Sequence, residues 1–522
     1  MINSVVNGKE DPIQIQVGDI DKCFDKLWLQ KTTNGLFEAG IQNDKLNLLY
    51  NENRSTKVAI KVNNQITRRV TMRDLELQGS VWGSIKCTVS MDKINKIMLA
   101  NDNLTYKYRG DSEIKLGVLG MIDDTLGISK CGTAAVAKNA VLNSFIETQR
   151  LTMSKKKSVV LHVGKKSKCL ISCPTLRVHD SEMKTAESVR YLGDIVSASG
   201  SLRPCIDDRR SKGWAKVAEI EGTLSAMPDR RRVIIGLKLR ETKLCNGMLY
   251  STEAWTNISD KEIERMEQVD LAALRTIIGG GHSRCPKPFY YLEYGLIMFR
   301  HIIMIKRINY HYHIITREDK ELIKRVYMKQ KESPIKGDWI HAVRKDYEFI
   351  GENLENMEDC IKNTSKDVFS KNIKYKVYQA AFKSYLELKE SCRKKMSNLT
   401  YEQFVIQDYL TSTQFNSEEK KLLFSLRSNC YPAKNNFKNM NKGNLKCIMN
   451  CDAIETQIHI FEHCEPVLSR LNLTETPTLN SIYGSPSEQK SAVEIFLKID
   501  KMRRHMIKNL LPGEDNARTQ DN

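Results

Sequence analysis

The chain has 522 residues, of which 41% are hydrophobic and 28% charged, and its formal net charge is +19. A disordered protein is excluded by this composition, and the length exceeds what one compact core uses, so we expect several domains. No apolar run approaches the roughly 20 residues of a membrane-spanning helix, and the N-terminus lacks a signal-peptide pattern. We therefore expect an intracellular protein with no membrane partner, whose positive charge calls for a polyanion such as nucleic acid.

Strands and helices alternate in the first 200 residues. Ile13, Ile15 and Val17 alternate with polar residues and predict a strand that leads into Asp19. Further strands are expected at 57–62, 66–71, 104–108, 114–121 and 158–163, with turns at Asn63-Asn64 and Arg109-Gly110-Asp111. Helices are expected at 23–29, 33–49, 92–99 and 134–151. The mixture ends at the Gly/Ser-rich segment 197–201.

The segments after this break have helical periodicity. Helices are expected at 211–225, 231–250, 260–277 and 290–313, and charge-rich helical sequence continues from 331 to 395. The run Gly279-Gly280-Gly281 follows a helix, so it predicts a helix end and not a phosphate-binding loop. Basic clusters recur, at Lys155-Lys156-Lys157 and Arg230-Arg231-Arg232 among other places. Each alone is typical of a solvated helix face, but together they favour binding to a nucleic acid.

Three carboxylates stand at the ends of two expected strands. Asp19 ends the first strand, and Asp123-Asp124 follow the apolar run 117–122. Carboxylates at adjacent strand ends can hold two divalent ions about 4 Å apart, and magnesium prefers such oxygen ligands. An Asp-Asp pair before a turn is more often simply solvated, so the surrounding segments decide between these interpretations.

Five segments resemble, in order, the palm motifs of LINE-like (non-LTR) retrotransposon reverse transcriptases. They are Gly18–Trp28, Leu77–Ser84, Met121–Asp124, Lys155–Ser158 and Tyr191–Ile195. The resemblance implies that Asp19 and Asp123 bind two Mg²⁺ ions, with Asp124 beside them. Lys157 would lie near the leaving pyrophosphate.

The same resemblance implies residues that hold the substrates. Phe24 would be the steric gate that excludes a 2′-hydroxyl, and Gln78 and Gly79 would shape the nucleotide and template pocket. Tyr191, Leu192 and Gly193 would form the primer grip. The competing interpretations are that Phe24 is a core residue, that Gln78-Gly79 form a turn and that the lysines belong to a solvated face.

Two departures from the family pattern bear on function. Met121 and Ile122 replace the usual aromatic and small residues before the aspartates, which affects primer contacts and fidelity. Little more than one strand, Met1–Gly18, precedes Asp19, where family enzymes have a fingers region. We therefore expect an N-terminally incomplete polymerase.

Near the C-terminus four soft ligands lie close together in the sequence. Cys447, Cys451, His459 and Cys464 have spacing that suits a tetrahedral zinc site, with His463 as an alternative ligand. The spacing also resembles the Cys-Cys-His-Cys knuckle of non-LTR elements, with one extra residue in the first cysteine pair. Buried thiols plus a surface histidine would be the alternative without metal.

The expected fold is α+β: a palm with an antiparallel sheet and helices, a mostly helical thumb and linker region, and a small zinc knuckle. The expected boundaries are 1–200, 201–430 and 431–470, followed by a helical tail at 471–522. The resemblance implies an RNA-directed DNA polymerase that uses an RNA template, a DNA primer or target and deoxynucleoside triphosphates. Its expected location is the nucleus when it acts on DNA, with the cytoplasm as the alternative. A catalytically incompetent nucleic-acid-binding remnant is the competing interpretation. A palm polymerase of a maturase or telomerase-like lineage is disfavoured by the knuckle spacing.

Overall fold

A computed structural model of the chain describes residues 2–54, 57–71, 82–130, 132–164, 175–227, 229–256, 258–280, 285–391, 399, 401–437, 445–473 and 476–510. The chain forms two compact units. The first unit comprises Met1–Cys205, Trp255–Asn257 and Ile314–Ala342, and the second comprises Ile206–Ala254, Ile258–His313 and Val343–Asn522. Strands and helices are both present, so the expected α+β class is confirmed.

The first unit is built on a five-stranded sheet with the order β13-β10-β1-β9-β8. Its strands are β1 (Ile13–Asp19), β8 (Val118–Met121), β9 (Asp124–Lys130), β10 (Val159–Val163) and β13 (Lys184–Ala186). The central strand β1 pairs antiparallel with both β9 and β10, whereas β13 pairs parallel with β10. The sheet is therefore mixed, where an antiparallel sheet was expected, because the chain returns to this edge in the direction of β10.

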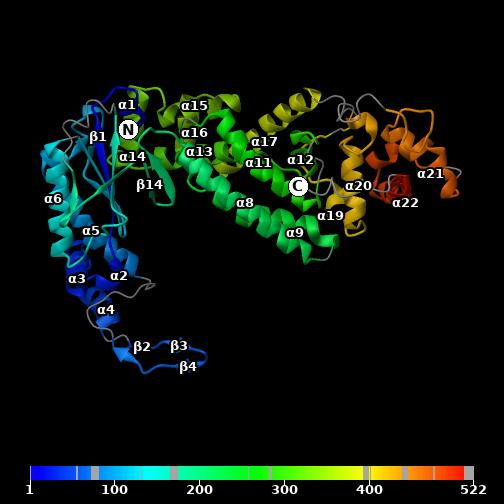
Figure 1. Cartoon of the computed structure of the whole chain (residues 1–522). Coiled ribbons are helices and arrows are strands. Elements are labelled where there is room, and N and C mark those ends of the chain that lie inside the picture. Colours follow the sequence, from blue (N-terminus) through cyan, green and yellow to red (C-terminus); the bar gives the residue numbers. More distant parts are fainter. Residues whose placement is uncertain are drawn as a thin grey trace. The chain divides into compact units, whose positions relative to one another are not determined.

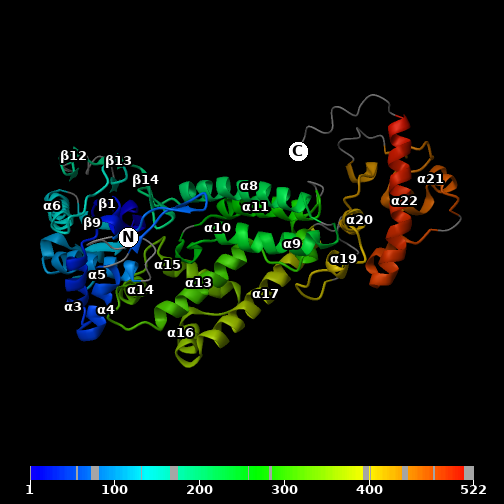
Figure 2. The same cartoon turned by 90° about the horizontal axis from the view of Figure 1, so that it is seen from below.

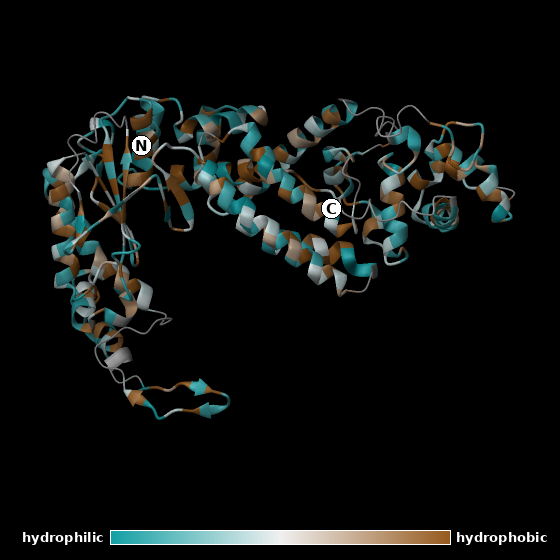
Figure 3. Cartoon of the chain, viewed as in Figure 1, coloured by the Kyte–Doolittle hydropathy of each residue, from teal (hydrophilic) through white to brown (hydrophobic). Residues whose placement is uncertain are grey.

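Side chains of β1 alternate between two cores. Ile13, Ile15 and Val17 join the core on one face, which also takes Val5 of α1 (Ile2–Val6). On the other face the Gln16 amide donates a hydrogen bond of 2.8 Å to Asn139 of α6 (Thr133–Thr148). The strands of the sheet are among the brown, hydrophobic segments of Figure 3. The period of two in the sequence thus produces the expected strand.

Helices and small hairpins complete the first unit (Figure 1). Its other helices are α2 (Cys23–Lys26), α3 (Leu29–Glu38), α4 (Asn43–Arg54), α5 (Gly83–Leu99), α6 (Thr133–Thr148) and α14 (Leu322–Glu332). Its short strands are β2 (Lys57–Val58), β3 (Lys61–Val62), β4 (Gln65–Ile66), β5 (Val70–Thr71), β6 (Tyr106–Lys107), β7 (Lys115–Leu116), β11 (Arg177–Val178), β12 (Ser181–Glu182), β14 (Ser188–Tyr191) and β15 (Asp194–Ser197). The turn expected at Asn63-Asn64 is confirmed, since both residues have positive φ between the paired strands β3 and β4.

The described part of the second unit is helical. Its main helices are α8 (Arg203–Ser225), α9 (Arg232–Leu239), α10 (Asn246–Met248), α11 (Asp260–Ile277), α12 (Lys287–Glu293), α13 (Phe299–Ile315), α15 (Trp339–Phe349), α16 (Leu354–Asn363), α17 (Lys366–Ser391), α19 (Asp408–Thr411), α20 (Ser417–Arg427), α21 (Glu465–Arg470) and α22 (Pro486–Leu510). Helices α8 and α11 run side by side (Figures 1 and 2), and Gly213 permits this contact, because a Cβ there would lie 3.0 Å from Val269. Among the described helices, none is long and apolar enough to cross a membrane.

Several expected helices differ in their bounds. The segment expected as one helix at 33–49 is broken at Gly40, whose φ of 92° ends α3. The segment at 290–313 is broken at Gly295, where a Cβ would lie 2.5 Å from the backbone of Ile406. The segment at 231–250 contains a π-helix, η4 (Arg240–Cys245). The helix end expected at Gly279-Gly280 is confirmed, with φ values of 86° and 89°, whereas Gly281 lies outside the described residues.

Candidate active site and metal centre

Strand pairing brings the three carboxylates to one end of the sheet. Asp19 is the last residue of β1 and lies directly opposite Asp124, the first residue of β9. Met121 pairs with Asp124 across the β8–β9 hairpin, so Ile122 and Asp123 form its two-residue turn. Residues far apart in the chain therefore meet at one site, and all three aspartates are half-buried there.

A close approach of the backbone positions Asp19. The Asp19 carbonyl accepts a hydrogen bond of 2.8 Å from the Ser154 amide. A Cβ at Gly18 would lie 2.4 Å from Met153 Cε and 2.7 Å from Thr125 Oγ1. A side chain at position 18 would therefore displace the Met153 and Thr125 side chains that pack against this strand.

Lys157 forms an ion pair with the first carboxylate. Its Nζ lies 3.2 Å from Asp19 Oδ1 and 3.1 Å from Oδ2, and this contact raises the pKa of the lysine. Burial raises the pKa of Asp124, and the negative charges of Asp123 and Asp19 raise it further, while Lys157 opposes the shift. Carboxylates that repel one another in this way form an arrangement that a divalent cation would relieve.

The turn that carries Asp123 has an unusual backbone. Ile122 has a φ of 59°, which is disfavoured for a β-branched residue, and its side chain packs against the core formed with α5 and α6. The buried thiols of Cys23 and Cys87 lie 3.2 Å apart below it, and Cys87 Sγ is 3.6 Å from the Ile122 carbonyl. No pattern in the sequence indicates this supporting role of Ile122 and Cys87, because it depends on a contact between separate segments.

The residues expected to hold substrates have different surroundings. Phe24 is half-buried and packs against the same core as Ile122, which fits its interpretation as a core residue, and its role as a gate stays a prediction. Gln78 and Gly79 lie outside the described residues. Leu192 and Gly193 form the turn of the β14–β15 hairpin, with φ values of 48° and 84°.

Tyr191 connects this hairpin to the strand that leads to the aspartates. Its hydroxyl donates a hydrogen bond of 3.3 Å to the Leu119 carbonyl of β8. Burial raises the pKa of Tyr191, and the charge of Asp124 raises it further. Tyr191 therefore contacts β8, the strand that leads to Asp123.

In the second unit the cysteines and histidine form one cluster. The ligand atoms of Cys447, Cys451, His459 and Cys464 all lie within 4.8 Å of one another. Cys464 Sγ is 3.8 Å from both Cys447 Sγ and Cys451 Sγ. A tetrahedron with Zn–S bonds of about 2.3 Å has ligands about 3.8 Å apart, so these donors fit zinc. His459 Nε2 is buried without a hydrogen-bond partner among the described residues, as a metal-binding nitrogen would be.

The alternative ligand His463 does not join the cluster. It is exposed, and its Nε2 lies 3.7 Å from the Glu462 carboxylate. The loop that carries the first two cysteines is held by the buried Glu455, which accepts hydrogen bonds from the Ile448 amide at 2.9 Å and from Arg503 of α22 at 2.8 Å. No motif in the sequence indicates the role of Arg503, since it lies in a separate helix.

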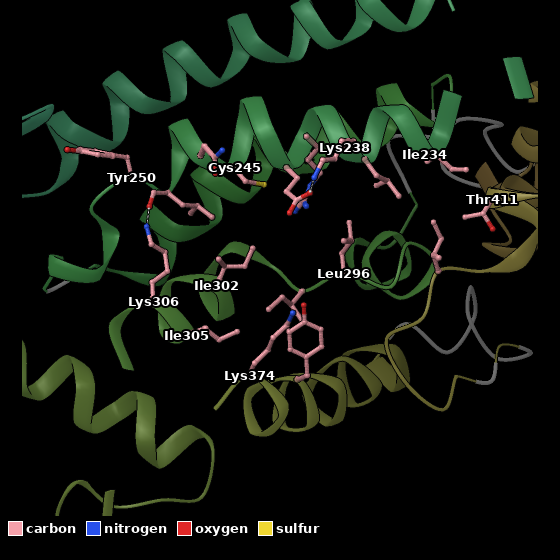
Figure 4. Close-up of a pocket in the computed structure, with 18 residues that line it drawn as sticks. Ile234, Lys238, Cys245, Tyr250, Leu296, Ile302, Ile305, Lys306, Lys374 and Thr411 are labelled. Carbon is pink, nitrogen blue, oxygen red and sulfur yellow. Dashed lines mark hydrogen bonds and ion pairs between the residues drawn. The ribbon is translucent and has the colours of Figure 1, made fainter. Parts of the chain in front are cut away.

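A separate cavity of about 1120 Å³ opens in the second unit. Its lining is mainly apolar and comes from α9, the π-helix η4, α13 and α17, with Leu296 and Ile302 facing it and Lys374 at its edge (Figure 4). None of the expected site residues is among its described lining.

Comparisons with known proteins identify no family. No family model matches the chain, and no curated protein matches it. Among solved structures, the chain is similar to telomerase from Candida albicans in a complex with the TWJ fragment of telomeric RNA, at 13% sequence identity and a TM-score of 0.24. The match covers 62% of this chain and 52% of that one, so the chain spans about half the length of that telomerase chain. A likeness at this level carries no argument about function.

Proposed function

We propose that this chain is the palm and C-terminal part of a LINE-like reverse transcriptase, an RNA-directed DNA polymerase. The observation that carries the proposal is the register of β1 and β9, which sets Asp19 opposite Asp124 with Asp123 in the adjoining turn. This arrangement agrees with the order of the motif-like segments in the sequence. Asp19 belongs to one motif-like segment and Asp123 and Asp124 to another, and strand pairing brings the two segments together.

The roles follow from the positions of the side chains. Asp19 and Asp123 would hold two Mg²⁺ ions, with Asp124 beside them. When bound, these ions activate the primer 3′-hydroxyl and stabilise the leaving oxygen. Lys157, whose side chain is 67% exposed while paired with Asp19, would exchange that carboxylate for the leaving pyrophosphate. Its positive charge would then stabilise the negative charge that develops there.

The remaining residues of the proposed site would position the substrates. Phe24 would exclude a ribose 2′-hydroxyl, Gln78 and Gly79 would line the nucleotide and template pocket, and Tyr191–Gly193 would hold the primer. The contact of Tyr191 with β8 supports the last role, since it ties the hairpin to the strand before the aspartates. The substrates would be an RNA template, a DNA primer or target and deoxynucleoside triphosphates, and the site of action on DNA would be the nucleus.

We further propose a palm at 1–200, a helical thumb and linker at 201–430, a zinc knuckle at 431–470 and a helical tail at 471–522. The zinc ligands would be Cys447, Cys451, His459 and Cys464, which the cluster geometry supports. Zinc would fix the loop 447–455 and the π-helix at 459–463 together.

Primer extension on an RNA template with magnesium tests the polymerase. We expect Asp123→Asn to reduce extension by at least about a thousandfold, because the amide removes a metal ligand while keeping the side-chain shape. Asp180→Asn is the matched control: Asp180 is exposed in the same unit, between β11 and β12, and this change should leave extension intact.

The same assay separates the alternative function. If the wild-type chain and Asp123→Asn extend equally poorly while both bind RNA, the polymerase proposal for this chain is wrong and the nucleic-acid-binding remnant is favoured. If Asp180→Asn loses as much activity as Asp123→Asn, the assignment of the carboxylates is wrong.

A further inference from the structure

Cations in the second unit gather around the end of α11. The Arg232 guanidinium donates hydrogen bonds to the carbonyls of Leu224, Thr276 and Ile277 at 3.1, 2.9 and 3.3 Å. Lys421 Nζ donates to the Gly279 carbonyl at 2.6 Å. We call Arg232, Lys420, Lys421 and Arg504 the α11 cluster.

Lys420, the other lysine of the α11 cluster, is buried. Lys420 is only 2% exposed, and its Nζ donates one hydrogen bond of 3.1 Å to the Arg230 carbonyl. Burial lowers its pKa. A buried ammonium that is held by a neutral carbonyl alone keeps an unbalanced charge, which is costly in the absence of an anion.

Carboxylates do little to neutralise the cluster. Within the described part of the chain, no carboxylate forms an ion pair with Arg232, Lys420 or Lys421; of the four cations only Arg504 has such a partner, Asp500. The C-terminal ends of α8 and α11 contribute about half a negative charge each, which balances one cation of the cluster. Burial lowers the pKa of Lys421, and the positive charges of Arg504 and Arg232 lower it further, so these cations repel one another.

The cluster retains donors and open space. Arg232 has five N–H groups and uses three, and Lys421 has three and uses one. Gly279 and Gly280 lie between them without side chains, and a Cβ at Gly280 would lie 3.6 Å from Lys421 Nζ. Lys421 is itself exposed, and the Arg504 side chain is 70% exposed, so an anion can reach these groups from solvent.

We propose that the α11 cluster is a binding site for the phosphodiester backbone of a nucleic acid. A chain of phosphates supplies several negative charges at regular spacing. These charges can contact the exposed cations Lys421 on α20 and Arg504 on α22 and the neighbouring guanidinium of Arg232 on α9. Binding would release counterions and would not depend on base sequence, because the donors are guanidinium and ammonium groups. The inference rests on the proposed function only for the choice of nucleic acid as the polyanion.

Arg232 and Lys420 also hold the fold together, so the test uses the exposed members of the cluster. Affinity of the full chain for a fluorescein-labelled, unstructured single-stranded RNA is measured over a range of potassium chloride concentrations. The variant is Lys421→Gln with Arg504→Gln. The control is Lys501→Gln, an exposed lysine of the same helix as Arg504 that pairs with Glu418.

We expect the double variant to lower the slope of log affinity against log salt concentration by about 1.4, at roughly 0.7 for each phosphate that the variant no longer neutralises. Affinity near physiological salt should fall roughly tenfold. Lys421→Arg keeps the charge and should keep the slope, which separates loss of charge from damage to the fold.

The proposal is overturned if the double variant has the same slope as Lys501→Gln. It is also overturned if the variant binds RNA normally but loses binding to phosphatidylserine vesicles, since the partner would then be a membrane surface. The salt slope is independent of primer extension. If Asp123→Asn has a normal salt slope and does not differ from wild type in primer extension, the polymerase proposal is wrong. The proposal for the α11 cluster is not affected by that result.

Discussion

Lys138 of α6 is a buried lysine below the strands that carry Asp123 and Asp124. It is 2% exposed, and its Nζ donates hydrogen bonds to the carbonyls of Gly117 and Ile128. Burial lowers its pKa from 10.5 to about 8. At 1.36 kcal/mol for each pKa unit, the folded state destabilises the charged amine by about 3 kcal/mol. This penalty is present in full below pH 8, where the lysine is protonated in both the folded and the unfolded chain.

We expect Lys138→Met to stabilise the first unit at pH 7. The penalty of about 3 kcal/mol disappears, and removal of the two hydrogen bonds costs about 1 kcal/mol each, so the net gain is about 1 kcal/mol. As pH rises above 8 the folded lysine loses its proton while the unfolded one keeps it. The unfolded chain then binds more protons, and wild-type stability rises with pH. By pH 9.5 the wild type should have gained about 2 kcal/mol relative to the variant.

Urea unfolding of both proteins at pH 7 and pH 9.5 measures this change. Other groups titrate in both proteins, so the difference between the two free energies of unfolding isolates Lys138. A difference that is the same at both pH values would refute the reasoning. It would mean that the pKa of the Lys138 amine is not lowered in the folded state, because water reaches the amine there.

Three further changes test the backbone approach at Gly18, the metal cluster and a buried ion pair of the second unit. Gly18→Ala should lower the free energy of unfolding by about 1–3 kcal/mol and also reduce primer extension, because its Cβ would meet Met153 Cε at 2.4 Å; unchanged unfolding in urea would contradict the close approach. Cys447→Ser should reduce bound zinc from one ion per chain to none in metal analysis, and full zinc content in this variant would exclude Cys447 as a ligand. Arg427→Met should cost about 3–5 kcal/mol in urea unfolding, since it leaves the fully buried Glu293 carboxylate without the guanidinium at 2.9 Å. A loss below 1 kcal/mol, which is about the cost of one hydrogen bond, would contradict a stabilising role of this ion pair.

Local patterns in the sequence predicted many single elements correctly. The alternation of Ile13, Ile15 and Val17 predicted β1, and the Asn63-Asn64 pair predicted a turn that requires positive φ. The glycines after α11 predicted its end. These predictions succeed because side-chain period and backbone φ preferences act through residues that are neighbours in the chain.

The spacing of the cysteines and histidine also identified the four members of the metal cluster. The choice between His459 and His463 needed the structure, which leaves His463 exposed and turns His459 toward the sulfurs. His459 is buried among the cysteines, whereas His463, next to Cys464 in the chain, is exposed. Burial in three dimensions therefore decided what spacing left open.

Sequence alone determined the residues of the two proposed sites: the aspartates at two strand ends and the four soft ligands near the C-terminus. Only the tertiary structure decided that Asp19 lies opposite Asp124, that β13 joins the sheet in parallel, and that Lys138 is buried beneath the strands. Strand order and register depend on contacts between segments far apart in the chain, and the burial of a charge depends on everything that packs around it. The periodicity of a single segment contains neither kind of information.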